Sequence, residues 1–360
     1  LLRALYEESS GVRIMAYTTI DNPFKNFNTV TFTGNGSTQS ITGVGFQPDW
    51  VWIKNRGAVT NHEVADSVRG ANKLIKPNDT DAEQNNSNKI TSFDSDGFGV
   101  GNDANVNQNS TAIVSWNWLA DGSTSSNGDG SITSTVSVNT TAGFSIVSYT
   151  GTGANATIGH GLGAVPKWII TKDRDNSNAW YVYHVGIGNT HGLRLSTTDA
   201  KEDDATLWND TTPTSSVFSV GSNTGTNRSA NPIIAYCFAE VKGYSRFGSY
   251  SGNGSTDGTF VYTGFKPALI ITKKSSASGT GWVMIDNKRE TTNDGSTNYV
   301  LANAATAETD SSFAVDFLSN GFKPRTNSGG TNTSGETYVY VAFAEAPFVT
   351  SGTKAAGTAR

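Results

Sequence analysis

The sequence has 360 residues, long enough for one large domain or for two to three ordinary ones with conventional hydrophobic cores. Its net charge is −5 without a long block of one sign, which argues against a nucleic-acid or anionic-membrane surface. A single cysteine, Cys237, excludes a disulfide within the chain, and 39 glycines with only 2 methionines favour short strands and many turns. We therefore predict no nucleic-acid partner, and no membrane insertion because no apolar run is long enough to cross a bilayer.

Residues 1–29 are expected to form an N-terminal extension and lead-in to the first domain. Met15 opens the run "MAYTTIDN" and has the features of a natural start, so we hypothesise that residues 1–14 are an upstream extension. The alternative is that these residues form a short surface helix. Intact mass and N-terminal sequencing of the native product would distinguish the two.

Three copies of one pattern follow, and each begins with a glycine turn: "FTGNG" at 32–36, "YTGTG" at 149–153 and "YSGNG" at 250–254. A phosphate-binding loop needs a helix after its glycines, and a P-loop also needs Gly-Lys-Ser/Thr. Neither feature follows these turns. We therefore interpret the glycines as tight turns between strands.

Each copy continues with a Gly-apolar-x-Pro corner and a strand that ends in a lysine: Lys54, Lys172 and Lys273. Proline suits a strand entrance, and the β-branched and aromatic residues after it suit a strand buried on both faces. An alternating strand comes next, at 62–66, 180–184 and 282–286, and an apolar strand closes the copy. Aligning the last aromatic residue of the closing strands pairs Trp118, Phe238 and Phe343.

Repeats of about 100 residues with many short strands and no helical stripe are typical of β-sandwiches, whereas solenoid repeats and propeller blades are shorter. We predict an all-β chain of three tandem β-sandwich repeats, jelly-roll or lectin-like, at residues 30–121, 143–243 and 244–346. Residues 122–142 are expected to be a Ser/Thr/Gly-rich flexible linker, unless the alternating "SITSTVSV" adds an edge strand. The short connection 241–248 predicts close docking of the second and third repeats, and 347–360 form a C-terminal tail, mobile or held by a partner.

The recurrent lysines, together with Glu240 and Glu345, predict structural ion pairs at strand ends, although the first copy has Ala120 at the position of the glutamate. The four histidines (His62, His160, His184 and His191) lack the spacing of a zinc site, and the acidic turns do not match a calcium-binding EF-hand loop. No nucleophile motif is present, although a distant carboxylate pair for glycoside hydrolysis stays open. We predict no catalytic residues, no cofactor and no metal.

Recognition is expected in the segments that differ between copies. Trp208 lies in the most divergent insert, between acidic residues, where an exposed ring can stack on a sugar or anchor a protein contact. Trp180 and His184 lie on the alternating strand of the second copy, at least half of whose aromatic residues should belong to the core. These three residues are the candidates for surface recognition. The alternative for Trp208 is that it fills its own loop.

The combination of glycine turn, Gly-Phe-x-Pro corner, lysine-ended strand and closing "FAE" followed by "GYSRFGSY" resembles repeated domains in structural proteins of marine bacteriophages. The resemblance covers residues 15–360. It implies a virion protein on a tail or fibre, with other virion proteins and a host-surface glycan or protein as partners. A homo-oligomer is expected, and a trimer is our guess.

The first copy departs from this pattern, because it has His62 where the others have Trp180 and Trp282 and it lacks the closing glutamate. It is therefore our candidate for the unit that attaches to the particle. Alternatives to the tail or fibre location and role are a capsid decoration protein, an extracellular array of carbohydrate-binding modules and a glycan-degrading enzyme of the particle.

Overall fold

A computed structural model describes residues 17–310 and 313–349 of the chain. The fold is all-β and contains several sheets that pack face to face, as the composition predicted. Helical structure in the described residues is limited to single turns: η1 (Pro23–Lys25), α1 (Ala104–Asn107), α2 (Ala205–Trp208) and α3 (Thr224–Asn227). No helix within this described part is long and apolar enough to cross a membrane.

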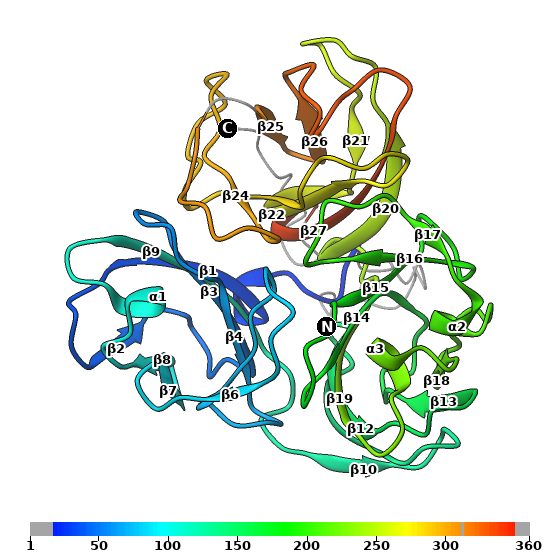
Figure 1. Cartoon of the computed structure of the whole chain (residues 1–360). Coiled ribbons are helices and arrows are strands. Elements are labelled where there is room, and N and C mark those ends of the chain that lie inside the picture. Colours follow the sequence, from blue (N-terminus) through cyan, green and yellow to red (C-terminus); the bar gives the residue numbers. More distant parts are fainter. Residues whose placement is uncertain (1–16, 311–312, 350–360) are drawn as a thin grey trace, which may run out of the picture.

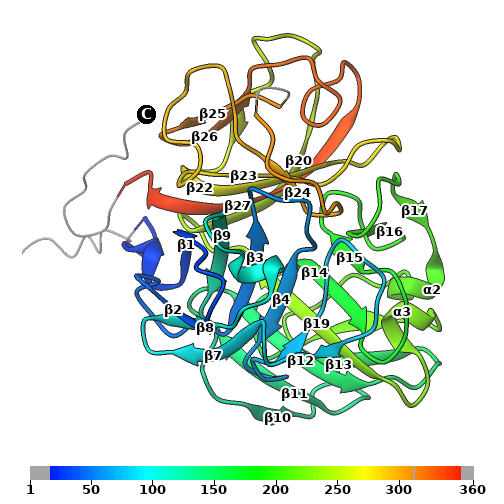
Figure 2. The same cartoon turned by 60° about the vertical axis from the view of Figure 1, so that its left-hand side comes forward.

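The strands are arranged in three lobes around a common centre (Figure 1; Figure 2). We define the lobes as residues 27–118, 125–239 and 245–347. In the first lobe the main sheet has the order β1 (Phe27–Thr33), β9 (Ala112–Trp118), β3 (Trp50–Asn55), β4 (Glu63–Asp66). A small sheet has the order β2 (Gln39–Thr42), β8 (Gly97–Val100), β7 (Ile90–Asp94), and β5 (Lys73–Leu74) pairs with β6 (Gln84–Asn85).

The second lobe has the longest main sheet, whose order is β10 (Ser125–Asn127), β11 (Ser134–Asn139), β12 (Phe144–Thr150), β19 (Pro232–Ala239), β14 (Pro166–Asp173), β15 (Tyr181–His184), β16 (His191–Arg194), β17 (Glu202–Asp203). Its small sheet pairs β13 (Ala156–Gly159) with β18 (Val217–Val220). Residues 122–142 thus contain β10 and β11, so this segment adds edge strands and is not a flexible linker. Alternation of Ile132, Val136 and Val138 with polar residues gives the segment one apolar side to bury.

The third lobe has the main-sheet order β20 (Ser245–Ser251), β27 (Thr337–Pro347), β22 (Phe265–Lys274), β23 (Val283–Asp286), β24 (Val300–Leu301). Its small sheet has the order β21 (Val261–Tyr262), β26 (Gly321–Pro324), β25 (Val315–Leu318). The four central strands therefore follow one order in every lobe: β1-β9-β3-β4, β12-β19-β14-β15 and β20-β27-β22-β23.

Both faces of each main sheet are buried, for different reasons. One face packs on the small sheet of its own lobe and forms a local core, such as Ile53, Phe98 and Ile113 in the first lobe. The other face meets the main sheets of the other two lobes in a shared core. This double burial explains the nearly continuous apolar sequence of the lysine-ended strands, since all six residues of β3 are buried.

The shared core closes on three aromatic rings, one from each lobe. Trp118, Phe238 and Phe343 contact one another with ring centroids 5.5, 5.7 and 6.3 Å apart. These are the three residues that the alignment of the closing strands paired. All eight tryptophans of the chain are buried, each at most 1% exposed, and such large rings bury much apolar area each.

Candidate functional site

The three recurrent lysines lie in the interior, at the seams between lobes. Each Nζ donates to a backbone carbonyl of the neighbouring lobe: Lys54 to Ala305 at 3.4 Å, Lys172 to Thr80 at 3.2 Å and Lys273 to Thr198 at 3.2 Å. The seams are thus cyclic, with the first lobe joined to the third, the second to the first and the third to the second. Burial lowers the pKa of all three lysines to about 8.

The predicted pairs between these lysines and Glu240 or Glu345 are wrong. The register pairs Lys273 with Val339, so Glu345 lies about 20 Å further along the strand, at about 3.4 Å per residue. Glu345 instead contacts Lys266 at 3.2 Å, and Glu240 contacts Arg246 at 2.8 Å. The sequence motif located both groups on neighbouring strands, but it could not give the offset between them.

The three candidate recognition residues are buried, so the surface interpretation is wrong for each. Trp180 and Trp208 are 1% exposed and His184 is fully buried. The Trp180 indole donates to the Lys76 carbonyl of the first lobe at 2.8 Å, and His184 Nε2 lies 3.0 Å from the Tyr340 carbonyl of the third. Trp208, the last residue of α2, packs in the local core of the second lobe, with its ring 5.9 Å from that of Tyr183 on β15.

The alternation of residues on β15 misled the surface prediction, because both faces of this sheet are covered. Trp180 belongs to a recurrent seam contact, in which Trp282 donates to the Arg194 carbonyl at 2.9 Å and His62 Nε2 lies 3.1 Å from the Leu301 carbonyl. The replacement of tryptophan by His62 in the first copy therefore changes a lobe-lobe contact. It leaves no distinct surface at that position.

Two of the three seams also contain a buried ionic network that sequence reasoning missed. Between the first and second lobes, Arg69 contacts Asp66 at 2.5 Å and Glu83 at 3.0 Å, and Arg174 contacts Glu83 at 2.9 Å. Burial opposes the charge of Arg69, but Asp66, Tyr236 and Glu83 together raise its pKa above the ordinary value.

The seam between the third and first lobes repeats this network. Arg289 contacts Asp286 at 2.6 Å and Glu308 at 2.9 Å, and Arg56 contacts Glu308 at 2.6 Å. The signal was present in the sequence as the spacing Asp-x-x-Arg in "DSVR" and "DNKR". The equivalent positions of the remaining seam carry His184, Ile187, Lys201 and Ser275.

The side chains that could bind a metal ion or transfer a proton are those of the acidic, cysteine and histidine residues. No group of three or more His, Cys, Asp or Glu side chains within 17–310 and 313–349 could hold a metal ion. His62, His160 and His184 are fully buried, and burial lowers the pKa of each imidazole. Their side chains serve packing and seam hydrogen bonds, since each ring contacts a backbone carbonyl.

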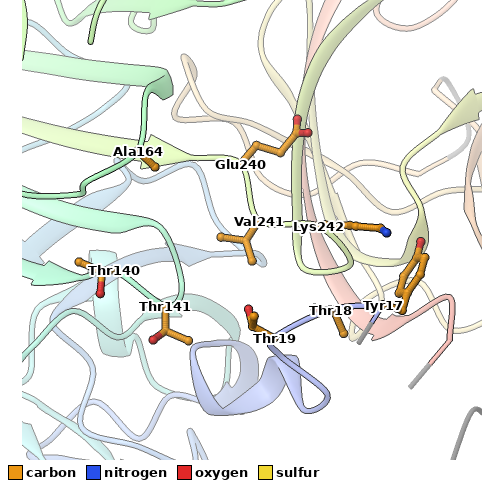
Figure 3. A pocket seen from close by; sticks show the side chains of 9 residues that line it. All are labelled: Tyr17, Thr18, Thr19, Thr140, Thr141, Ala164, Glu240, Val241 and Lys242. Atoms are coloured by element: carbon orange, nitrogen blue, oxygen red, sulfur yellow. The ribbon is translucent and has the colours of Figure 1, made fainter. Parts of the chain in front are cut away.

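A solvent-accessible groove of about 520 Å³ lies where the lead-in residues 17–19 cross the connection from the second to the third lobe (Figure 3). Glu240, Val241 and Lys242 of that connection form its centre. Thr140, Thr141 and Ala164 of the second lobe form one end, and Tyr17 forms the other. We call this the connection groove.

A second cavity of about 260 Å³ adjoins the connection groove and shares Tyr17, Glu240 and Lys242 with it. The Tyr17 hydroxyl donates to the Gly264 carbonyl at 2.5 Å, and Lys242 Nζ lies 4.6 Å from the centre of the Tyr17 ring. Burial, followed by the hydrogen bond with Tyr262, raises the pKa of Tyr17 to about 12. The ring therefore stays neutral and can present a face to a ligand.

The chemistry of the connection groove suits binding. The groove and the adjoining cavity together are lined by two tyrosine rings, several threonine hydroxyls, a carboxylate and two cationic groups, which matches the hydroxyls and apolar faces of a sugar. The Glu240 carboxylate is engaged by Arg246, an arrangement that fixes its position. Sequence reasoning missed the groove, because its residues come from four separate segments of the chain, whose proximity no local pattern indicates.

Comparisons with known proteins place all three lobes within one family. A family model described as Domain of unknown function (DUF7483) matches residues 22–347. The match begins before β1 and ends at the last residue of β27, so a single model spans the shared core and all of the seams. No curated protein matches the chain.

Proposed function

The chain belongs to the DUF7483 family, and from that premise we propose that it is a non-enzymatic structural protein of a bacteriophage particle. Its place is the tail or a fibre, and its role is adsorption to the host surface. The proposal is supported by the motif combination that resembles phage structural proteins. It is also supported by the connection groove, whose side chains can bind a sugar or a protein surface. Its partners are other virion proteins and a host-surface glycan or protein, and the trimeric assembly remains our expectation.

We further propose that the three lobes are tandem β-sandwich repeats of one unit, jelly-roll or lectin-like in topology. Three features support a common origin of the lobes: the shared order of four central strands, the matching lysine contacts, and the aligned rings of Trp118, Phe238 and Phe343. In this proposal the repeats form a rigid scaffold. The irregular connections, such as those that line the connection groove, recognise the host surface, because loops on a rigid scaffold can vary without disturbing its core.

The observation that carries the adsorption role is the connection groove, with Lys242 in its centre and Tyr17 at one end. Tyr17→Ala removes the ring that a sugar would stack on, and Lys242→Ala removes the neighbouring ammonium. We expect either variant to weaken binding of the purified chain to host cells by about tenfold, corresponding to roughly 1–3 kcal/mol for one aromatic or charged contact. Binding of labelled protein to cells measures the effect.

The matched control is Lys201→Ala, which removes an exposed lysine from the second lobe outside the groove and should leave cell binding unchanged. Competition with intact particles for adsorption tests the role itself, and immunogold labelling of particles tests the location. Wild-type protein that binds neither particles nor cells would overturn the proposal. A fall in the viscosity of host polysaccharide would instead favour a glycan-degrading enzyme.

A further inference from the structure

The local core of the first lobe contains a lysine, a glutamate and an asparagine in mutual contact. Lys89, just before β7, and Glu63, the first residue of β4, have side chains 4% and 0% exposed and form an ion pair. Asn105 of α1 donates from Nδ2 to the same Glu63 oxygen, Oε1, at 2.7 Å. Because the amine and the carboxamide share one oxygen as partner, their nitrogens lie within about 5.5 Å of each other.

In the other two lobes, different residues occupy the positions of this cluster. The strand registers make Glu63 equivalent to Tyr181 and Val283, and matching backbone hydrogen bonds make Lys89 equivalent to Leu207 and Ala314. The position of Asn105 is occupied by glycine, Gly225 in the second lobe and Gly330 in the third, and a neighbouring aromatic ring packs on each glycine. The fold therefore forms with apolar residues at these positions, and the polar cluster must be explained separately.

The stabilisation expected from a Lys89–Glu63 ion pair does not account for the burial of these polar groups. Buried ion pairs are often no more stabilising than apolar residues of similar volume, because both charges lose their hydration. The second carboxylate oxygen of Glu63, Oε2, is buried without a hydrogen-bond partner among the described residues. Burial raises the pKa of Glu63, although the Lys89 ammonium opposes the shift, so the neutral acid is favoured relative to a carboxyl group in water.

We propose that Lys89 and Asn105 join in an intramolecular isopeptide bond, with Glu63 as the proton carrier. Transfer of a proton from the ammonium to Glu63 leaves a neutral amine beside a neutral acid. The amine lone pair attacks Cγ of Asn105, and the Glu63 acid gives its proton to Nδ2, the atom that it contacts in the structure. The Cγ–Nδ2 bond then breaks, Nδ2 leaves as ammonia, and the Glu63 carboxylate takes the surplus proton from Nζ.

The reaction balances without an oxidant or a cofactor. One alkylammonium and one primary carboxamide give one secondary amide and one ammonium ion, because the ammonia takes the proton from Glu63 as it leaves and restores the carboxylate. The product ties the segment that precedes β7 to α1; the segments that flank them otherwise meet through backbone hydrogen bonds from Gly101 to Lys89 and from Asp103 to Asn88. This inference is independent of the proposed virion role, because the bond depends only on the cluster.

Intact-mass spectrometry of the purified full-length chain, after denaturation, tests the proposal. We expect a mass below that of the sequence by about 17 Da, the mass of one ammonia lost in amide exchange. Digestion should then release a branched peptide that links Lys89 to Asn105. A mass equal to that of the sequence would overturn the proposal. So would a loss of about 18 Da, one water, which would mean condensation of Lys89 with Glu63.

Two variants separate the roles within the cluster. Lys89→Met removes the nucleophile and follows the apolar residues found at this position in the other lobes, so the chain should fold and keep its full sequence mass. Glu63→Gln cannot accept the proton and should also keep its full mass. The control Lys201→Met, in the second lobe, should show the ammonia loss of the wild type. Persistence of the loss in Lys89→Met would contradict the assignment of the nucleophile, and persistence in Glu63→Gln would contradict the role of the acid.

Discussion

Single residues at the seams show how this chain uses buried charge. Lys172 donates to three backbone carbonyls, those of Thr80, Asp173 and Asn176, at 3.2, 2.7 and 3.1 Å. Carbonyl oxygens at the ends of strands need donors, and an ammonium supplies three at once. The cost is desolvation of the charge, which lowers the pKa of the lysine to about 8.

This shift predicts a pH dependence of stability. The pKa of Lys172 falls from its ordinary value of 10.5 to about 8 in the folded chain. Between these values the unfolded chain holds a proton that the folded chain has released, so this lysine makes stability rise as pH increases. Relative to Lys172→Met, the wild type should gain about 1 kcal/mol in free energy of unfolding from pH 7.5 to 9.5. Urea titrations at both pH values measure the difference.

The control for this experiment is Lys201→Met, because Lys201 is exposed. Its pH profile should run parallel to that of the wild type. A Lys172→Met profile that is also parallel would show that the ammonium is as well solvated in the folded chain as in the unfolded one. The measurement should stop at pH 9.5, because tyrosines of the unfolded chain begin to ionise above that pH and also change the stability.

At the scale of elements, the seams hold the lobes together through matching strand ends. In each seam a backbone hydrogen bond joins equivalent positions: Glu83 to Arg174, Glu308 to Arg56 and Lys201 to Ser275, at 2.7, 2.9 and 2.9 Å. Two seams add the ionic network, and the third has Ile187 at the position of the central arginine. The same backbone geometry thus accepts either the ionic network or a set of residues without a carboxylate, His184, Ile187, Lys201 and Ser275.

Arg69→Ile should destabilise the chain strongly, because it leaves Asp66 and Glu83 buried without their shared cation. Removing one partner from a buried ion pair typically costs about 3–5 kcal/mol. Arg69→Ile combined with Asp66→His, Glu83→Lys and Arg174→Ser copies the residues of the third seam, so it should recover most of that loss. Chemical denaturation of the two variants measures this comparison.

The combined variant distinguishes lost charge balance from lost packing. If the combination is no more stable than Arg69→Ile alone, the ionic network contributes to the seam through specific geometry that the third seam does not reproduce. Arg228→Ile is a suitable control. Its guanidinium is partly exposed and pairs with Asp173 at 2.7 Å within the second lobe, so the loss should be smaller.

At the scale of the whole molecule, the shared core makes the three lobes interdependent. The ring of Phe238 contacts Trp118 of the first lobe and Phe343 of the third, and it stacks on Trp168 of its own. Each main sheet thus depends on the other two lobes to cover one of its faces. We therefore expect one cooperative unfolding transition for the chain and no stable folding of a single excised lobe.

Phe238→Ala should lower the free energy of unfolding by about 3–5 kcal/mol, since it opens a cavity where the three lobes meet. Hydrogen exchange should then accelerate in β9 and β27, which belong to the other lobes. The matched control is Phe218→Ala, a change in the local core of the second lobe; for amides that exchange by local opening, its effect should stay within that lobe. Equal acceleration in all lobes by both variants would contradict separate local cores.

The sequence predicted the all-β class, the turns at the glycines and the strand that follows each proline, because these depend on local backbone preferences and on alternation of apolar residues. It also paired Trp118, Phe238 and Phe343 from the periodicity alone. It failed for Trp180 and His184, since alternation along a strand shows that its faces differ and cannot show whether a second layer covers the outer one. It failed for Trp208 because an insert that differs between copies can still bury its ring in the local core.

What the sequence by itself determined is the set of strands and the residues that recur in each copy. Only the tertiary structure decided what those residues do. The lysines, the Asp-x-x-Arg pairs and the aromatic rings act across lobes, and contacts between distant segments depend on register and on the relative position of sheets. The connection groove and the Lys89–Glu63–Asn105 cluster likewise arise where separate segments meet, which no local pattern encodes.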